Sequence, residues 1–528
     1  MTTTTDVVVA GGGHNSLVTA AYLAKAGYEC IILEARSVPG GGAITEELLL
    51  PGYRFDTCST GHTLLQANPL IRDDELGLVS QYGLSYVDPD PVAHVAFPDG
   101  ESLTMWLDLD RTCEEIARFS DKDAVSYRQL LSEYDEVKSI VGATRFRPVG
   151  HGPSAEEALA GHPRRGVWMR RMVLSATDVI RKEFDDAHVR AFMGWMASQT
   201  AVPIDGAGTG LLAYQIVSGR QARSWSLPVG GSGRLIDALV GFLDDHGATI
   251  RCDEPVKDLV LENGRCVGVR TEAGEEYRAR HAVVSTIHVK HLVDMAPSDA
   301  WGEDFVYGVE TYDPGVPFFA CYFAATAPPI FTTSDGGRSA VSAGLAGWLD
   351  DQVRAGREVS DGRFVEDPGF VLVATPTLAD AGRTPEGRHT VKIVTFNCYD
   401  HPDGGPAHWD EIKEAHADRL LAQVQRFAPN FSDEVIEGRL VKSPLDIERG
   451  NRHMVNGAPH GGDRRIAFVG AQRPAPGWAQ HRMPIPGLYQ TGGTTHPGGS
   501  ITGAPGRNAA IVLLQDLGRD PADLMGSL

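Results

Sequence analysis

The N-terminal stretch constrains the fold of this chain more than any other feature. The β-prone run DVVVA at residues 6–10 precedes the glycine-rich turn GGGHNS at 11–16, and LVTAAYLAKAG then places apolar residues at helical spacing. A second β-prone run, CIIL at 30–33, ends at Glu34. Strand, glycine turn, helix, strand and acid in this order predict a βαβ unit that binds a dinucleotide.

Each glycine position of this turn has its own expected task. Gly11 permits the tight turn, and Gly13 lets the backbone approach a pyrophosphate at the helix N-terminus. Glu34 is placed to accept hydrogen bonds from a ribose hydroxyl pair. Ser16 stands where a third glycine would let the helix pack closely on the strand, so we expect it to affect packing and not phosphate binding.

Two further glycine-rich segments extend the expected site. The cluster at 40–42 follows the acid, where a loop lets the backbone approach an extended cofactor, although an ordinary turn is an open alternative. Near the C-terminus a short strand-like run, GLYQT at 487–491, leads into GGTTHPGGS at 492–500 and then a helical pattern. The positive end of that helix dipole would favour negative charge on a cofactor ring.

These blocks resemble the phytoene dehydrogenase and carotene ketolase branch of FAD-dependent oxidoreductases. The resemblance rests on GGGHNSLVTAAYLAKAG, VPGGGAITEE, PGYRFD and TGGTTHPGGSITGAPGRNAA, with central matches in PVGGSGRLIDAL at 228–239 and RARHAVVSTIH at 278–288. It implies FAD as cofactor, with a strand near Val256 at the adenine. It does not name a substrate, because the branch is similar to proteins whose substrates are not carotenoids.

The resemblance and the motifs together give a set of expected FAD contacts. They are Gly11, Gly13, His14, Asn15, Ser16, Glu34, Ala35, Arg36, Gly41, Gly42, Ala43, Val256, Ser285, Gly492, Gly493, Gly499, Ser500 and Ile501. One departure concerns Gly493, where many related flavoproteins carry an acid for a ribityl hydroxyl. Backbone N–H groups or Thr494 would then supply the ribityl contacts.

The expected fold is α/β, with a discontinuous, doubly wound Rossmann-type FAD-binding domain. Residues 1–65, 228–290 and 455–528 would form this domain. Residues 66–227 are expected to form a mainly helical substrate or cap region. Residues 291–454 are expected to form a mixed-sheet substrate domain, which the resemblance places over the flavin.

Composition excludes several classes of function. Of the 528 residues, 48 are Lys or Arg and 69 are Asp or Glu, so the net charge of −21 repels nucleic acid. Seven scattered cysteines without a CxxC pair suit reduced thiols in the cytoplasm better than disulfides or a zinc site, and no metal is expected. No apolar run reaches the roughly 18 residues of a membrane helix, while peripheral membrane contact and the oligomeric state stay open.

Two histidines are candidates for catalysis. His62 and His496 lie in glycine-rich segments that the resemblance brings near the flavin ring, where histidine can position substrate or carry a proton. For His496 the favoured alternative is that it only holds its loop by hydrogen bonding. Arg473 and Arg482 precede the C-terminal loop and are candidates to bind a substrate carboxylate, with surface ion pairing as the alternative.

The expected reaction moves hydride from a carbon of an apolar or partly apolar small molecule to the flavin. Apolar stretches at 192–203 and 317–331 would line a substrate tunnel or simply form core. Alternatives are a flavin-dependent isomerase, an amine oxidase and a carotenoid ketolase-like enzyme. GGSG at 230–233 is a poor second dinucleotide motif, so the expected electron acceptor is oxygen, a quinone or a redox protein, and not a nicotinamide.

Overall fold

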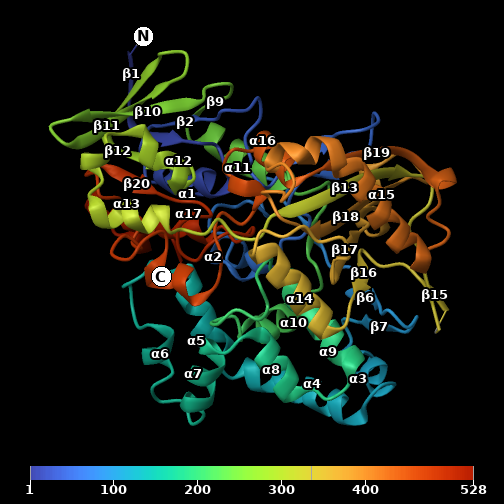
Figure 1. The fold of residues 1–528 in the computed structure, drawn as a ribbon. Coiled ribbons are helices and arrows are strands. Elements are labelled where there is room, and N and C mark those ends of the chain that lie inside the picture. Colours follow the sequence, from blue (N-terminus) through green and yellow to red (C-terminus); the bar gives the residue numbers. More distant parts are fainter. Residues whose placement is uncertain (1, 335, 527–528) are drawn as a thin grey trace.

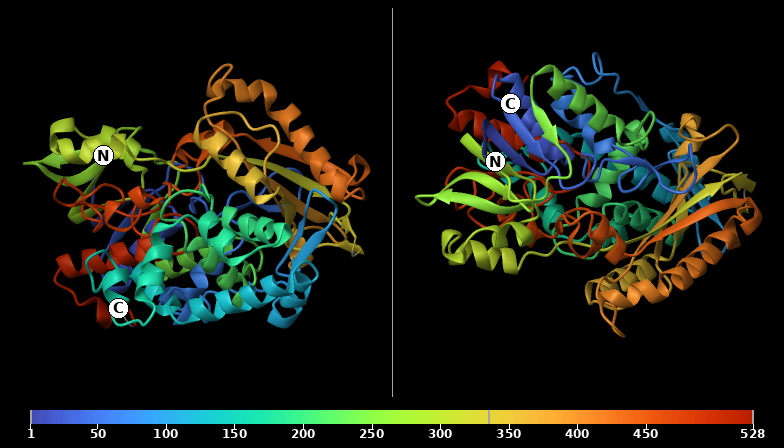
Figure 2. Two further views of the ribbon diagram at one scale, coloured as in Figure 1. Left: turned by 60° about the horizontal axis from the view of Figure 1, so that its bottom comes forward. Right: turned by 90° about the horizontal axis from the view of Figure 1, so that it is seen from above.

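The computed structural model describes residues 2–334 and 336–526. Two seven-stranded sheets lie apart from one another, and a group of helices from the first half of the chain lies below them and packs against one of the two (Figure 1). The views in Figure 2 show the same separation. The chain ends near α5 (Lys138–Ala143), so the two termini lie on different sides of the molecule (Figure 1).

The first sheet has the strand order β10-β11-β12-β1-β2-β9, with β20 beside β12. The strands are β1 Thr2–Ala10, β2 Cys30–Leu33, β9 Thr249–Arg251, β10 Val256–Glu262, β11 Arg265–Thr271, β12 Glu276–Ser285 and β20 Leu488–Gln490. β20, β12, β1, β2 and β9 run parallel, and β10 and β11 form an antiparallel extension. All three expected segments of the FAD-binding domain therefore contribute strands, while the domain boundaries stay a prediction.

Helices cover both faces of this sheet. Val7 and Val9 of β1 point into a core with α1 (His14–Lys25), α11 (Arg234–Asp245) and α17 (Ala504–Asp516). Val8 points the other way, toward α12 (Val289–Leu292) and α13 (Glu303–Glu310). A strand buried on both faces explains the unbroken apolar run in the sequence, and the expected doubly wound α/β architecture is confirmed.

The second sheet has the order β19-β13-β18-β17-β16-β6-β7. Its strands are β6 Ala93–Ala96, β7 Ser102–Met105, β13 Phe318–Ala325, β16 Ser342–Ala346, β17 Phe370–Ala374, β18 His389–Phe396 and β19 Ile436–Lys442. Side chains alternate along β13: Phe319, Cys321 and Phe323 pack in a core with α15 (Trp409–Phe427). α15 lies along the outer face of this sheet (Figures 1 and 2), which leaves the other face directed inward.

The middle of the chain is mainly helical, as expected, but it is not confined to helices. Its longer helices are α3 Leu109–Ala117, α4 Asp121–Asp135, α7 Arg165–Val173, α8 Ala176–Glu183, α9 Ala187–Ser198 and α10 Leu212–Arg223. Short helices are α2 Pro69–Arg72 and α6 Ala155–Ala158, and later in the chain come α14 Leu349–Ser360 and α16 Pro444–Gly450. Three small ribbons pair β3 Thr45–Glu47 with β4 Arg54–Asp56, β5 Tyr86–Val87 with β8 Leu227–Pro228, and β14 Phe331–Thr333 with β15 Gly336–Arg338.

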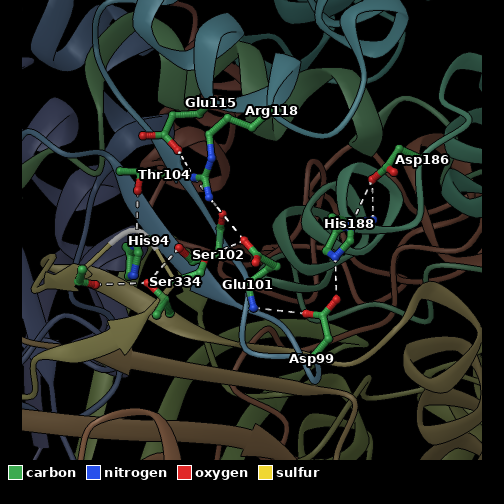
Figure 3. A network of polar contacts seen from close by, with 12 residues as sticks. His94, Asp99, Glu101, Ser102, Thr104, Glu115, Arg118, Asp186, His188 and Ser334 are labelled. Carbon is green, nitrogen blue, oxygen red and sulfur yellow. Dashed lines mark hydrogen bonds and ion pairs between the residues drawn. The ribbon is translucent and has the colours of Figure 1, made fainter.

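The β6–β7 hairpin belongs to the second sheet, although its residues fall within the segment expected to be a helical cap. A polar network joins it to the helices (Figure 3). Asp99 in the hairpin turn binds Nε2 of His188 on α9 at 2.8 Å, and Glu101 accepts from Arg118, just after α3, at 3.3 Å. These contacts join the second sheet to the helical segment.

Candidate active site

The site begins where three parallel strands of the first sheet end. After β1 the N–H of Gly11 donates to the carbonyl of Leu33, and after β12 the N–H of Thr286 donates to the carbonyl of Ala10 (2.7 and 2.9 Å). The chain after β20 continues the series, because Thr491 donates to Ser285. Loops from distant parts of the chain therefore meet at the carboxyl edge of the sheet, where ligands bind in open α/β folds.

Glycines leave room for a ligand at this edge. Gly11 has a φ of +98°, and a Cβ there would lie 2.5 Å from Cγ2 of Thr286. A Cβ on Gly41 would lie 3.1 Å from Cα of Gly13, so the second glycine cluster packs directly on the first. A Cβ on Gly13 itself would lie 3.9 Å from the Thr286 side chain, an ordinary contact distance, and Gly13 lines the cavity described below. This is the cradle that a pyrophosphate at the N-terminus of α1 requires.

Glu34 is fixed by the loops on either side of it. Its Oε2 accepts from the N–H of Gly12 at 2.8 Å, and its Oε1 accepts from the N–H of Arg36 at 3.0 Å. The residue is 7 % exposed, yet it lines the cavity described below. A carboxylate held in this way keeps lone pairs for ribose hydroxyls.

Ser16 does more than substitute for a glycine. Its hydroxyl lies 2.5 Å from the carbonyl oxygen of Gly11 and 2.8 Å from that of Gly13, so it holds the glycine turn by hydrogen bonding. The close helix approach occurs elsewhere, at Gly506 of α17, where a Cβ would lie 2.3 Å from the carbonyl oxygen of Asn15. The hydroxyl of Ser16 therefore contributes hydrogen bonds to the turn, and the expectation that Ser16 does not affect phosphate binding stays a prediction.

The C-terminal loop explains the missing acid. A Cβ on Gly493 would lie 2.9 Å from the carbonyl oxygen of His460 and 3.2 Å from Nε2 of His453, so no larger side chain fits there. Thr494, expected to serve a ribityl chain, is fully buried and accepts from Gln490 instead. After the loop, α17 begins at Ala504, as the sequence predicts.

These segments line one cavity of about 760 Å³. The expected contacts on its wall are Gly11, Gly13, His14, Asn15, Glu34, Ala35, Arg36, Gly41, Gly42, Val256, Gly492, Gly493, Gly499, Ser500 and Ile501. Ser16, Ala43 and Ser285 are buried behind the wall and support it. The cradle, the acid and a cavity that continues from Val256 to Gly493 fit an extended dinucleotide such as FAD.

The opposite wall comes from the inner face of the second sheet. Phe318, Ala320 and Tyr322 of β13 line the cavity, as do Leu372, Val394 and Lys392 on the neighbouring strands. Only Gln199 of the other apolar stretch reaches the cavity, while Phe192 and Trp195 belong to the core. The stretch at 317–331 therefore contributes to the site, and most of 192–203 is core.

Lys392 is the charged group of this wall. Its Nζ donates to the carbonyls of Asp56 and Cys58 at 3.1 and 2.8 Å and to the hydroxyl of Thr60 at 2.7 Å. Burial lowers the pKa of Lys392. All three donors are in use, so the lysine holds the segment from Asp56 to Thr60 against the sheet.

Neither candidate catalytic histidine lies on the cavity wall. His62 is buried and contacts Ser232 Oγ at 2.7 Å and the Tyr86 hydroxyl at 3.3 Å. His496 donates through Nε2 to the carbonyl of Thr144 at 2.8 Å, which is the loop-holding contact considered as the alternative. Burial lowers the pKa of His62 to about 3 and that of His496 to about 4, so both rings are neutral near pH 7. Both side chains hold neighbouring segments instead of lining the cavity, and a catalytic role for either stays a prediction.

Neither of the two candidate arginines lines the cavity. Arg473 is fully buried and donates to backbone carbonyls, including that of Gly493 at 3.0 Å. Arg482 forms a two-pronged ion pair with Asp516 at 2.7 and 2.8 Å. For Arg482 the ion pair considered as the alternative is what the structure shows.

Several residues that line the cavity are not among the contacts expected from the sequence. Thr286 follows the strand end VVS by one position, so its place at the carboxyl edge could have been recognised. Trp225, His453 and His460 come from connecting segments, which carry no periodic signal. A Cβ on Gly61 would lie 2.2 Å from the Trp225 ring, and this fit is visible only in three dimensions.

The fold and the cavity together define an FAD-dependent oxidoreductase. A sequence profile of the family described as flavin containing amine oxidoreductase matches residues 17–305, and the chain belongs to this family. In the described part of the chain, no helix has the length and apolar character to cross a membrane.

Relatives match along nearly the whole chain. "Pyridine nucleotide-disulfide oxidoreductase domain-containing protein 2" of Rattus norvegicus is 28% identical, covering 97% of this chain and 94% of that protein. One of the subunits of limonene dehydrogenase from Castellaniella defragrans is 27% identical (97% and 95%), and "hydroxyneurosporene desaturase" of Cereibacter sphaeroides is 26% identical (97% and 98%). These relatives confirm the resemblance to desaturase-like FAD oxidoreductases.

Solved structures show the same fold. Cyclohexylamine oxidase from Brevibacterium oxydans superposes with a TM-score of 0.58 at 16% identity, covering 98% of this chain and all (100%) of that one. An oxidoreductase from Methanosarcina mazei gives a TM-score of 0.60 at 16% identity, with the same coverage. At these identities the likeness concerns the fold.

Proposed function

We propose that the protein is a dehydrogenase or desaturase that removes hydride from a carbon atom of an apolar or partly apolar small molecule. The carrying observation is that the apolar inner face of the second sheet and the glycine loops of the first line one cavity. Two relatives support this reaction type by their names. One is a subunit of limonene dehydrogenase, and the other is named hydroxyneurosporene desaturase. When bound, FAD supplies the hydride acceptor.

The chain's own contribution is positioning and exclusion of water. Phe318, Ala320 and Tyr322 offer an apolar surface on which a substrate carbon can be held, and such alignment provides much of the rate enhancement of a transfer step. Burial lowers the pKa of His14 and of His453 to about 4, so these wall histidines are neutral near pH 7. Transfer of hydride needs a dry, aligned C–H bond more than a charged acid or base.

The acceptor of the electrons is proposed to be oxygen, a quinone or a redox protein. In GGSG, the segment that most resembles a second dinucleotide turn, the N–H of Ser232 donates to Asp56 and that of Gly233 to the Thr45 hydroxyl (2.8 and 2.9 Å). Because these N–H groups already donate within the protein, they are not available to bind the phosphate of a nicotinamide cofactor. The scattered cysteines support a reducing compartment, and we propose the cytoplasm.

The test compares classes of reactive bond. The FAD-loaded protein is mixed anaerobically with limonene, with perillic acid as its carboxylated counterpart, and with cyclohexylamine, while flavin absorbance and product mass are followed. Bleaching by an alkene with a product lighter by two hydrogens supports the proposal. Bleaching by the amine alone supports an amine oxidase, and a product of unchanged mass formed only by reduced enzyme supports an isomerase.

A further inference from the structure

A group of basic side chains lies directly behind one part of the cavity wall. We call Arg145, Arg464 and Arg473 the basic cluster. Nη2 of Arg464 donates to the carbonyl of Gly499 at 2.8 Å and contacts Nδ1 of His460 at 3.2 Å. Both of these partners line the cavity. The cluster therefore adjoins the compartment between the C-terminal loop and the second sheet.

The positive charge of the basic cluster has no matching carboxylate. Arg473 donates to backbone carbonyls, and the contact of Arg145 is with the amide of Gln215 at 3.4 Å. The neighbouring carboxylate of Asp463 is engaged by Arg465, at 2.9 Å from its Nε. Within residues 2–334 and 336–526, no ion pair joins a member of the cluster to an acid. Buried cations in proteins are normally paired, because an unpaired one is costly.

One donor of the cluster also remains free. Nε of Arg464 is buried without a hydrogen-bond partner in the described chain, whereas the guanidinium of Arg473 lies over the Tyr312 ring, 5.8 Å from its centroid. Burial, together with the charges of Arg145 and Arg473, lowers the pKa of Arg464 to about 9, so it stays protonated near pH 7. In a chain with a net charge of −21, an uncompensated positive group of this kind indicates that a ligand supplies the negative charge.

The apolar wall begins beside the cluster. The rings of His460 and Phe318 lie 6.2 Å apart between centroids, and Phe318 is the first of the cavity-lining residues of β13. A molecule with its apolar part on β13 would bring one end to His460 and Gly499, against which Arg464 lies. Guanidinium groups match carboxylate and phosphate oxygens in geometry and charge.

We propose that the basic cluster is the subsite for an anionic head group, a carboxylate or a phosphate, of the substrate. This inference rests on the proposed function and narrows its substrate class. The substrate would join an oxidisable apolar segment to an anion, which sets it apart from a pure hydrocarbon. Arg464, which contacts the wall residues Gly499 and His460, would supply the positive charge at the head group, and Arg145 would strengthen the positive potential behind it.

Equilibrium binding to the FAD-loaded protein tests the subsite without turnover. Decanoate, decyl phosphate and decanol are titrated while the visible flavin spectrum is followed. We expect at least one anion to bind at least tenfold more tightly than decanol, and Arg464→Gln to abolish that preference with little effect on decanol. Tighter binding of decanoate assigns a carboxylate, and tighter binding of decyl phosphate assigns a phosphate.

Two further variants make the result decisive. Arg145→Gln lowers the positive potential of the basic cluster by a change in a different segment of the chain. It therefore serves as the test variant if Arg464→Gln does not fold. Arg482→Gln removes one positive charge from a surface ion pair and is expected to leave all three affinities unchanged. Equal binding of the anions and decanol would overturn the proposal. The proposal would also be overturned if Arg464→Gln changed the midpoint potential of the flavin and left anion affinity unaltered, because the basic cluster would then act on the flavin ring and not on the substrate.

The binding result is independent of the reaction. An isomerase or an amine oxidase outcome in the turnover test would refute the proposed function and leave the anion preference measurable. Conversely, a confirmed dehydrogenase without anion preference would refute only the subsite.

Discussion

Replacing Glu34 probes the adenosine end of the cavity most directly. The carboxylate accepts one N–H from Gly12 at 2.8 Å and one from Arg36 at 3.0 Å, and we expect it also to accept from a ribose hydroxyl. Hydrogen bonds to a charged group contribute about 1.5–3 kcal/mol each. In Glu34→Gln one carboxylate oxygen becomes an NH₂ group, so one of the two loop donors faces another donor.

We therefore expect Glu34→Gln to weaken FAD binding by about 1.5–3 kcal/mol, which is roughly 10- to 160-fold. Glu34→Ala removes every contact of the carboxylate, so its loss of FAD affinity should be at least as large as that of Glu34→Gln. The assay is a titration of FAD into apoprotein, followed by quenching of flavin fluorescence. Urea unfolding of both apoproteins separates loss of affinity from general destabilisation.

The control is Glu262→Gln, which removes an exposed charge paired with Arg278 on the same sheet. It should bind FAD like the unmodified protein. If Glu34→Gln binds FAD within threefold of the unmodified protein, the carboxylate neither holds the loop nor contacts the ribose, and the reasoning fails.

Four other outcomes are expected. Ser16→Ala should lower FAD affinity by about 1–2 kcal/mol in the same titration, because two loop carbonyls lose their shared donor, and an unchanged affinity would show that the hydroxyl is dispensable. Gly61→Ala should displace Trp225 and cost about 1–3 kcal/mol of unfolding free energy in urea, with tryptophan fluorescence reporting the movement; an unshifted spectrum would contradict it. Burial lowers the pKa of His416 to about 4, so below about pH 6.5 the unfolded chain binds a proton that the folded chain does not, and stability falls with the pH. His416→Asn should therefore remove about 1 kcal/mol of the difference in unfolding free energy between pH 7 and pH 5.5. NADH or NADPH, added anaerobically, should leave the flavin absorbance unbleached, whereas rapid bleaching would indicate a reductase.

The cofactor side of the site could be predicted because its signals are local. A strand, a turn, a helix and an acid lie within one continuous stretch, and backbone geometry dictates what glycine does there. The runs PFFACYF, GFVLVAT and TVKIVTF of the sequence are likewise β-prone, and they form the strands at 318–325, 370–374 and 389–396.

The directions of side chains and the pairing of strands distant in the sequence could not be predicted in this way. Adjacency to a glycine loop does not say where His62 or His496 points, and both turn away from the cavity toward Ser232 and Thr144. The β6–β7 hairpin joins a sheet whose other strands begin at Phe318, and only its edge pairing with β16 reveals this. The hydroxyl of Ser16 reaches back to the turn that precedes it, which a comparison of side-chain sizes does not capture.

The arrangement of the first sheet also dictates the order in which this protein matures. During synthesis β1 emerges first, yet its partner β12 and the β20 strand beside it follow hundreds of residues later. The face of α1 stays uncovered until Gly506 arrives, when the hydroxyl of Thr19 can donate to its carbonyl at 2.9 Å. A nascent chain therefore lacks the contact of α17 with the N-terminal turn, and we expect tight cofactor binding only once this helix has been synthesised. Loss of that helix should damage the N-terminal turn as severely as a change within the turn itself.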